Sequence, residues 1–481
     1  MSGVFIALAG FAVMLALMMA RAPIGFAMLA VGAAGYAYLA GPTALVGYMK
    51  TNAYHQFANY TLSVIPLFIL MGALAERGGI ATALFKSAAR ATRRMPGGLA
   101  MAVIGACTAF GAICGSAVAT TATFGRAALP ELEKYRYDGG FATGTIAVGG
   151  TLGILIPPSV ILVVYAITTE QNIAKLFQAA LIPGLLAALS YCVTIAIIVY
   201  RRPDLAPRLE KTEEDAPPPA KGWSRVIGAA VLAIAASLHV SGAAGWQVTS
   251  ALAALAIVIL VVEATVMPPI LVAIVVVGGI YGGVFTPTEG AAVGAIAMLL
   301  VGVAQRSLGV REILDAIRQT AETAGMIFII LLGAEVFGAF LALSRLPTIA
   351  AETIGGSGLP AHLVLIGMLA FYILLGAVMD ELAMILLTLP VFFPVVQALD
   401  FGMPPDDVAI WFGILVLIVV GIGLTAPPVG LNVFVISALA RSVPITQTYA
   451  GVMPFLVADL IRLLAVVAFP WLALWLVHAL N

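Results

Sequence analysis

Long apolar runs, separated by short polar or glycine- and proline-containing segments, recur along the whole of this chain. A run of about 20 apolar residues can cross the hydrocarbon core of a bilayer as a helix. The pattern therefore predicts an all-α polytopic membrane protein. About twelve spans are expected, near residues 3–20, 25–42, 58–77, 142–166, 178–200, 226–241, 248–264, 267–284, 287–304, 324–344, 409–436 and 450–478.

Two further apolar regions, 97–130 and 361–396, do not fit a simple span. Gly115-Ser116 interrupts the first and Asp380-Glu381 the second, so each half is shorter than a full crossing. We interpret both as re-entrant helical hairpins, which enter the bilayer, turn and leave on the same side. Non-helical backbone at that depth must be covered by protein or line a wet cavity.

The composition is that of a membrane protein. Hydrophobic residues make up 62% of the 481 residues and charged residues 10%, whereas soluble domains are about 45–50% apolar and about 25% charged. The 23 basic and 23 acidic residues balance, which argues against nucleic-acid binding. Cys107, Cys114 and Cys192 lie in apolar runs and are expected to be buried thiols, not metal ligands or disulfides. No basic residue precedes the first apolar run, so we expect a retained span and not a cleaved signal peptide.

The lysines and arginines indicate the topology. If the N-terminus is outside and both hairpins return to their own side, most of the 23 basic residues are cytoplasmic. Only Lys50, Lys175 and Arg345 then lie outside, with Arg126 and Arg462 at membrane depth. This bias follows the positive-inside rule, and it requires that neither hairpin crosses the membrane.

An internal repeat links the two halves of the chain. Four pairs of residues are each 264 positions apart: Pro23 and Pro287, Pro96 and Pro360, Ser116 and Asp380, and Pro130 and Pro394. The Pro157-Pro158 pair matches Pro427-Pro428 at an offset of 270. The predicted topology places Pro23 inside and Pro287 outside, so the repeats are inverted. Inverted repeats whose broken helices meet at the midplane are typical of secondary transporters.

The interrupted segments carry the candidate chemistry. Ser116, Thr120 and Thr121 follow a helix break at Gly115, where free carbonyl and hydroxyl oxygens suit a monovalent cation and helix N-termini suit a carboxylate. The alternative is a small-residue packing seam. The proline pair at 157–158, beside Gly149, Gly150 and Gly153, predicts an unwound span, or alternatively a structural kink. Its mate, 421–432, adds Thr425 and Asn432.

Acidic residues inside an apolar hairpin are costly, by about 2.5–3.5 kcal/mol each. We expect Asp380 to bind a cation directly or through a neighbour, and Glu381 to accept hydrogen bonds at the start of the returning helix; a purely structural N-cap is the alternative. Asp459 and Arg462 are expected to neutralise each other, and Glu335 to face protein or a cavity. Arg126 can snorkel or meet a substrate carboxylate.

The remaining sequence motifs point to structure and not to catalysis. Thr286, Pro287 and Glu289 predict a capping box. The chain has no Walker A, HExxH, GxSxG or CxxC motif, so we do not expect an enzyme.

Several of these stretches resemble the large membrane subunit of tripartite ATP-independent periplasmic (TRAP) transporters of the DctM or SiaM type. The resemblance covers nearly the whole chain outside 203–265. It is carried by PLFILMGALAERGG (66–79), GAICGSAVATTA (111–122), GTLGILIPPS (150–159), GGIYGGVFTPTEGAAVGA (278–295), MDELAMILLTLPVFFPVV (379–396) and GLTAPPVGLNVFVIS (423–437).

The resemblance implies an inverted-repeat elevator transporter of the bacterial inner membrane. A sodium gradient (Na+ being the coupling ion) would drive uptake of an organic anion, usually a carboxylate, delivered by a periplasmic substrate-binding protein. A small four-helix membrane subunit would be a separate polypeptide. Residues 1–96 and 266–359 would hold scaffold spans and arm helices, near 78–95 and 346–358. Residues 97–200 and 360–481 would form the transport domain. The residues themselves, and not the resemblance, predict a cytoplasmic linker with two extra spans over 201–265.

The resemblance also implies two sodium sites, each at a hairpin tip and the unwound span that faces it. They correspond to Ser116, Gly153, Ile156 and Pro158 in one half, and to Asp380, Gly423, Ala426 and Pro428 in the other. Many of these residues would act through backbone carbonyls. Thr120, Thr121, Thr425 and Asn432 are the expected substrate ligands.

The spans 226–241 and 248–264 depart from the family pattern, which joins its halves more directly. An even number of added helices preserves the inverted parity, and we expect the pair to pack against the scaffold or the small subunit. Two other functions stay open: a stand-alone sodium/dicarboxylate symporter of related fold, and a passive channel.

Overall fold

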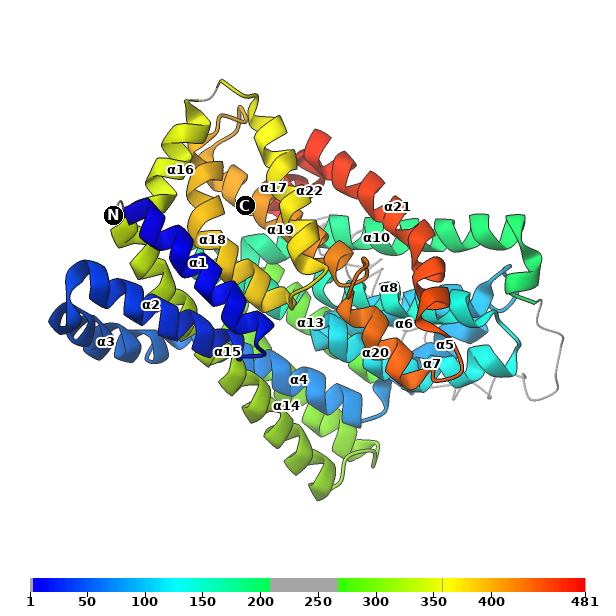
Figure 1. Ribbon diagram of the computed structural model, residues 1–481. Coiled ribbons are helices and arrows are strands. Elements are labelled where there is room, and N and C mark those ends of the chain that lie inside the picture. The colour runs from blue at the N-terminus through cyan, green and yellow to red at the C-terminus, as the bar shows by residue number, and fades with distance from the viewer. Residues whose placement is uncertain (1–2, 208–266, 357, 481) are drawn as a thin grey trace, which may run out of the picture.

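The computed structural model describes residues 3–207, 267–356 and 358–480, and within these ranges its regular structure is helical (Figure 1). The extra spans 226–241 and 248–264, and most of the linker, lie outside the described residues. Among the residues described, seven helices are long and apolar enough to cross a membrane, or eight if one bent pair counts as a single span. Six more apolar helices have 10–17 residues.

The order of elements in the first half recurs in the second. The first half contains α1 (Gly3–Met19), α2 (Ile24–Ala40), α3 (Pro42–Phe57), α4 (Val64–Arg77), α5 (Ile80–Thr92), α6 (Gly98–Cys114), α7 (Ala117–Lys134), α8 (Gly139–Leu155), α9 (Val160–Thr168) and α10 (Ile173–Arg201). The second contains α13 (Met267–Tyr281), α14 (Pro287–Ala304), α15 (Val310–Ser344), α16 (Leu346–Gly355), α17 (Ala361–Gly376), α18 (Glu381–Ala398), α19 (Pro405–Gly423), α20 (Leu431–Leu439), α21 (Ile445–Ala468) and α22 (Trp471–Leu480). The series α5–α10 corresponds to α16–α21.

Both apolar regions that were expected to turn back are helical hairpins. In the first, the Leu99 amide at the start of α6 donates to the hydroxyl of Tyr137, which follows α7, at 3.3 Å. In the second, the rings of His362 at the start of α17 and Phe401 beyond α18 lie 5.5 Å apart. Figure 1 shows α17 and α18 as the two arms of a V. The hairpin prediction is therefore confirmed, and the depth of the tips in a bilayer stays a prediction.

Both proline pairs interrupt helices, as expected. α8 ends at Leu155 and α9 begins at Val160, with a bend of 44° between them. α19 ends at Gly423 and α20 begins at Leu431. Proline has no N–H and clashes with the preceding turn, so two in succession end a helix. The capping box is also present, with Thr286 and Glu289 each accepting the other's backbone N–H.

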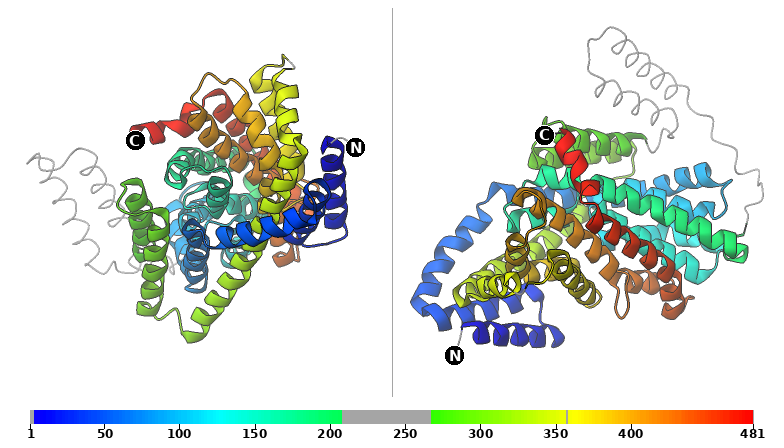
Figure 2. Two further views of the ribbon diagram at one scale, coloured as in Figure 1. Left: turned by 90° about the vertical axis from the view of Figure 1, so that its left-hand side faces the viewer. Right: turned by 90° about the horizontal axis from the view of Figure 1, so that it is seen from above.

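The helices gather in two groups. α2 packs along α15, and α4 packs against α14 and α15. The hairpin α6–α7 packs on α8, α19 contacts α17 and α18, and α21 contacts α8. Figure 2 shows α1–α3 extending to one side, near the N-terminus. The assignment of these groups to a scaffold and a moving domain stays a prediction.

Four element boundaries differ from the sequence prediction. Residues 42–57, in which no span was expected, form α3, whose polar side chains lower its hydropathy. The single span at 450–478 is wrong: α21 ends at Ala468 and α22 begins at Trp471, because Pro470 disfavours helical backbone at Phe469 (φ −128°, ψ 77°). α10 and α15 begin before the apolar runs that predicted them, since their first turns are more polar.

Candidate functional site

The tip of the first hairpin lies against the break in α8–α9. Gly115 ends α6 with φ +64°, and a Cβ there would lie 2.9 Å from the Pro158 carbonyl oxygen. Glycine is needed both for this backbone conformation and for the close approach. Ser116 then caps α7, its hydroxyl accepting from the Ala119 amide at 3.4 Å.

Gly153 brings the broken span to the same tip. A Cβ at Gly153 would lie 2.5 Å from the Ser116 carbonyl oxygen and would also meet the Thr120 hydroxyl. Ile156 caps the C-terminus of α8 within the break. The structure therefore groups Ser116, Gly153 and Pro158 at one hairpin tip, with Ile156 in the neighbouring non-helical segment. Their binding of sodium stays a prediction.

The second tip is built in a similar way. A Cβ at Gly423 would lie 2.7 Å from the Gly376 backbone at the end of α17. The Ala377 carbonyl accepts from the Val429 and Gly430 amides, at 3.1 and 3.3 Å. The segment between α19 and α20, which contains Ala426 and Pro428, is thus hydrogen-bonded to the hairpin tip.

Sequence reasoning missed Tyr449 of α21 at this second tip. Its hydroxyl donates toward the carbonyls of Pro428 and Val429, at 2.9 and 2.6 Å. Tyr449 therefore orients the carbonyl that was expected to face sodium. No local pattern in the sequence could have indicated a contact between residues about twenty positions apart through a helix break.

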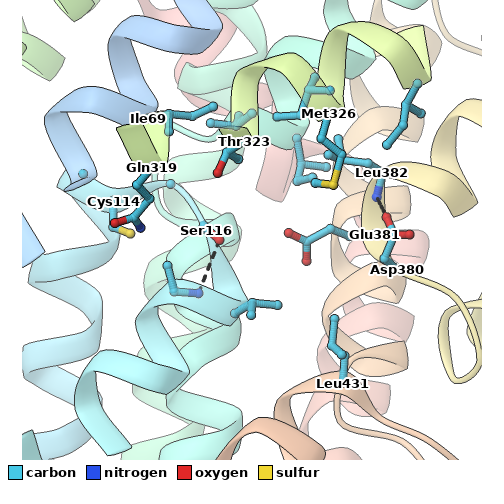
Figure 3. A pocket seen from close by; sticks show the side chains of 18 of the residues that line it. Ile69, Cys114, Ser116, Gln319, Thr323, Met326, Asp380, Glu381, Leu382 and Leu431 are labelled. Atoms are coloured by element: carbon cyan, nitrogen blue, oxygen red, sulfur yellow. Dashed lines mark hydrogen bonds between the residues drawn. The ribbon is translucent and has the colours of Figure 1, made fainter. Parts of the chain in front are cut away.

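A cavity of about 880 Å³ separates the two tips (Figure 3). The hairpins contribute Ser116, Asp380 and Glu381 to its wall, and α15 contributes Gln319 and Thr323. The rest of the wall is mostly apolar, and Leu431 at the start of α20 also reaches it. A large concave site with a few converging polar groups is the usual form of a small-molecule site.

Of the two neighbouring acids at the second tip, Asp380 forms the helix cap that was the alternative for it, and Glu381 turns toward the cavity. Asp380 caps α18, because its Oδ1 accepts from the Leu382 and Ala383 amides at 3.1 and 3.0 Å. Glu381 instead points into the cavity, as Figure 3 shows, and its buried Oε2 has no hydrogen-bond partner. A cation at Asp380 stays a prediction. Glu381 is thus a cavity-wall carboxylate with an oxygen that no protein group satisfies.

The four expected substrate ligands lie behind the cavity wall. Thr120, Thr121, Thr425 and Asn432 are each fully buried. Thr120 donates to the Ser116 carbonyl at 2.7 Å, and the Asn432 amide donates to the Ala147 carbonyl at 3.1 Å. In this arrangement they hold the tips and broken helices together, and their contact with substrate stays a prediction.

Arg126 pairs with Glu76 at the wall of the cavity. Its guanidinium lies 2.6 Å from the Glu76 carboxylate, and the two side chains are 55% and 19% exposed. The pair joins α7 of the first hairpin to α4. This carboxylate partner was not expected from the sequence.

The described residues hold no group of three or more His, Cys, Asp or Glu that could bind a metal ion. Cys107 and Cys114 are buried free thiols and Cys192 is a half-buried one. The carbonyls and hydroxyls at the two tips are oxygen donors, which fit a hard monovalent cation better than a transition metal.

Comparison with known proteins identifies the fold and the family. The model of the DctM component of tripartite ATP-independent periplasmic transporters matches residues 11–472. The chain is 32% identical to the C4-dicarboxylate TRAP transporter large permease protein DctM of Pseudomonas aeruginosa, over 88% of this chain and 87% of that protein. It is 28% identical to the sialic acid TRAP transporter large permease protein SiaM of Vibrio cholerae, over 96% of each.

Among solved structures, the YdaH transporter of Alcanivorax borkumensis has a similar fold. The TM-score is 0.54 at 15% identity, with 90% of this chain and 89% of that chain covered. The family match and the curated relatives agree over nearly the whole length. The chain therefore belongs to the DctM component family of tripartite ATP-independent periplasmic transporters.

Proposed function

We propose that this chain is the membrane permease subunit of a sodium-coupled, binding-protein-dependent importer of an organic anion. Membership of the family makes it a multi-pass subunit of a secondary transporter for organic acids. The observation that carries the finer proposal is the pair of hairpin tips, each docked on a helix break and both lining one cavity.

Sodium coupling is supported by the donors at the tips. Broken helices leave backbone carbonyls without intrahelical partners, and transporters use such carbonyls to coordinate coupling ions near helix termini that hold an anionic solute. Here Ser116 and Asp380, which occupy equivalent positions of the two repeats, cap the returning helices beside those breaks. A sodium ion at each tip would place positive charge beside the acidic solute.

An elevator motion is supported by two cavities along α15. Residues 319–330 of α15 contribute to the first cavity and residues 331–338 to a second, of about 480 Å³. Glu335 is among these α15 residues, and the end of α9 and residues 386–394 of α18 also line the second cavity. α15 thus forms one wall of both cavities, and residues of the hairpins and of α9 line the other wall of each. Sliding of the hairpins along α15 would close one cavity and enlarge the other.

The partners would be a separate small four-helix membrane subunit and a periplasmic substrate-binding protein. The decisive experiment reconstitutes the permease with both partners in vesicles and follows uptake of an organic anion. We expect an inward sodium gradient to drive uptake without ATP, and an equal choline gradient to fail. Uptake at full rate without sodium would reject the coupling.

The same vesicles discriminate the alternatives. Uptake at an undiminished rate without the binding protein would favour a stand-alone sodium/dicarboxylate symporter. A conductance that does not saturate with solute concentration would favour a channel.

A further inference from the structure

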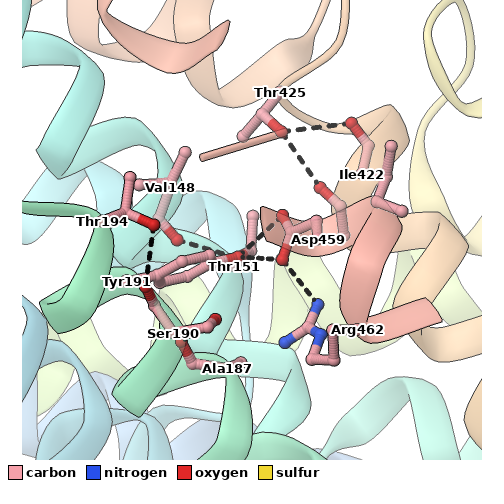
Figure 4. A network of polar contacts seen from close by, with 11 residues as sticks. Val148, Thr151, Ala187, Ser190, Tyr191, Thr194, Ile422, Thr425, Asp459 and Arg462 are labelled. Atoms are coloured by element: carbon pink, nitrogen blue, oxygen red, sulfur yellow. Dashed lines mark hydrogen bonds and ion pairs between the residues drawn. The ribbon is translucent and has the colours of Figure 1, made fainter. Parts of the chain in front are cut away.

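A buried polar network joins three helices behind the cavity (Figure 4). Asp459 and Arg462 of α21 form an ion pair at 2.8 Å and are only 1% and 5% exposed, which confirms their expected pairing. The hydroxyl of Tyr191, from α10, lies 2.9 Å from both Asp459 carboxylate oxygens. The Thr151 hydroxyl of α8 lies 3.2 Å from the same Tyr191 hydroxyl.

The network ends where the two broken helices cross. Thr151 is two residues before Gly153, which packs on the first hairpin tip. A Cβ at Gly421 of α19 would lie 3.6 Å from the Thr151 Cβ. Thr151 and Gly421 are 270 positions apart, the offset that aligns the two proline pairs, so equivalent residues of the two repeats touch each other.

The second repeat continues from this crossing. The Thr425 hydroxyl, in the break after α19, donates toward the Gly421 and Ile422 carbonyls, at 3.3 and 3.1 Å. A contiguous series of contacts therefore runs from the Asp459–Arg462 pair through Thr151 to the segment beside the second tip. Thr151, in the helix before the first break, thus lies against the helix before the second break.

Substrate binding does not account for the network. Asp459, Arg462 and Tyr191 lie outside the wall of the cavity between the tips. A buried ion pair adds little net stability compared with well-packed apolar residues, and its best-attested use is to specify one arrangement. Connected buried hydrogen bonds also make a core more rigid. The network suits a part of the molecule in which two helices must keep a fixed crossing.

We propose that Tyr191, with Asp459 and Arg462, is a positioning residue that holds α8 and α19 at their crossing and thereby couples the two sodium sites. The proposal rests on the proposed sodium coupling. A rigid crossing transmits a shift at one helix break to the other, so an ion bound at one tip changes the sodium affinity of the other site.

The test compares sodium activation curves of the reconstituted complex. Tyr191→Phe removes only the hydroxyl, whereas changing Asp459 would leave a buried guanidinium without its partner. We expect the half-saturating sodium concentration to rise about tenfold, within the usual range of coupling between sites, and the Hill coefficient to fall toward 1. Thr151→Val should also raise the half-saturating sodium concentration and lower the Hill coefficient. Thr151→Ser keeps the hydroxyl and should retain the wild-type curve.

Tyr281→Phe is the matched control. That hydroxyl donates to the Phe177 carbonyl at 2.7 Å, joining α13 to α10, and neither residue hydrogen-bonds to the network or lines the cavity between the tips. Its loss should lower thermal stability without moving the sodium curve. Wild-type curves for both Tyr191→Phe and Thr151→Val would overturn the inference alone. A wild-type complex without sodium activation would overturn both the inference and the proposed function.

Discussion

Replacing Asp380 by asparagine separates its charge from its role as a helix cap. The Asp380 Oδ1 accepts from two amides at the start of α18, and asparagine caps helices about as well as aspartate. Asp380→Asn should therefore keep the hairpin folded. Asp380→Ala should lose the cap as well, at about 1 kcal/mol.

The magnitude of the charge effect follows from Coulomb's law. With an effective dielectric constant of about 20, a carboxylate attracts a sodium ion by ~4 kcal/mol at about 4 Å and by ~2 kcal/mol at about 8 Å. Those energies correspond to roughly thirtyfold to a thousandfold in affinity, at about 1.4 kcal/mol per factor of ten. We expect the half-saturating sodium concentration for uptake to rise within this range in both variants.

The comparison of the two variants decides the role of Asp380. If Asp380 only caps α18, Asp380→Asn retains the wild-type sodium curve and only Asp380→Ala is impaired. Thermal unfolding of the purified complex, measured in parallel, reports the cap separately. Ser116→Ala is the counterpart in the first repeat, and because a hydroxyl carries no net charge we expect a smaller shift. Wild-type sodium curves for Asp380→Asn and Ser116→Ala would remove both residues from the sodium sites.

Three further changes test the cavity and its surroundings. Gly153→Ala places a Cβ against the Ser116 carbonyl and should abolish sodium-dependent uptake. Gly105→Ala is the control and should leave uptake unchanged, because no atom lies within 4 Å of its Cβ. Normal uptake by Gly153→Ala would contradict the tight docking of the tip on the break. Glu381→Gln removes an unpaired carboxylate that would repel an anionic solute from the cavity wall. In competition assays, the affinity for a dianion should therefore rise about tenfold relative to that for a matched zwitterion. An unchanged ratio of the two affinities would mean that Glu381 does not face the solute as an anion. Arg126→Gln breaks a partly exposed ion pair between α7 and α4. The equilibrium between this arrangement of the two helices and any other should shift by up to about fivefold, which changes the distribution of spin-label distances between them. An identical distribution would show that the pair does not stabilise this arrangement.

Local chemistry explains why the architecture was readable from the sequence. Pro157-Pro158 and Pro427-Pro428 stand in the middle of long apolar runs, where they interrupt a helix because proline lacks the N–H that the helix interior needs. At the hairpin tips, Ser116 and Asp380 have side chains that favour the start of a helix, and each caps the returning arm. The two hairpins and the two broken helices therefore followed from residue order and spacing. Pro470 also separates two helices, but Pro130, Pro183 and Pro454 lie inside helices, so a single proline in an apolar run did not decide between the two.

The wall of the site depended on packing between elements distant in the chain. Asp380 caps α18 and Glu381 is its first residue, and both line the cavity. The packing of α18 against its neighbours decides that the Glu381 side chain points into the cavity, while the Asp380 Oδ1 accepts from the start of the helix. The Arg126–Glu76 pair and the hydroxyl of Tyr191 against Asp459 are likewise contacts between separate helices. The sequence alone determined where the chain turns and breaks, because proline, glycine and capping side chains act on the backbone within a few residues. Tertiary structure alone decided which polar groups meet, because that depends on the rotation and docking of whole helices.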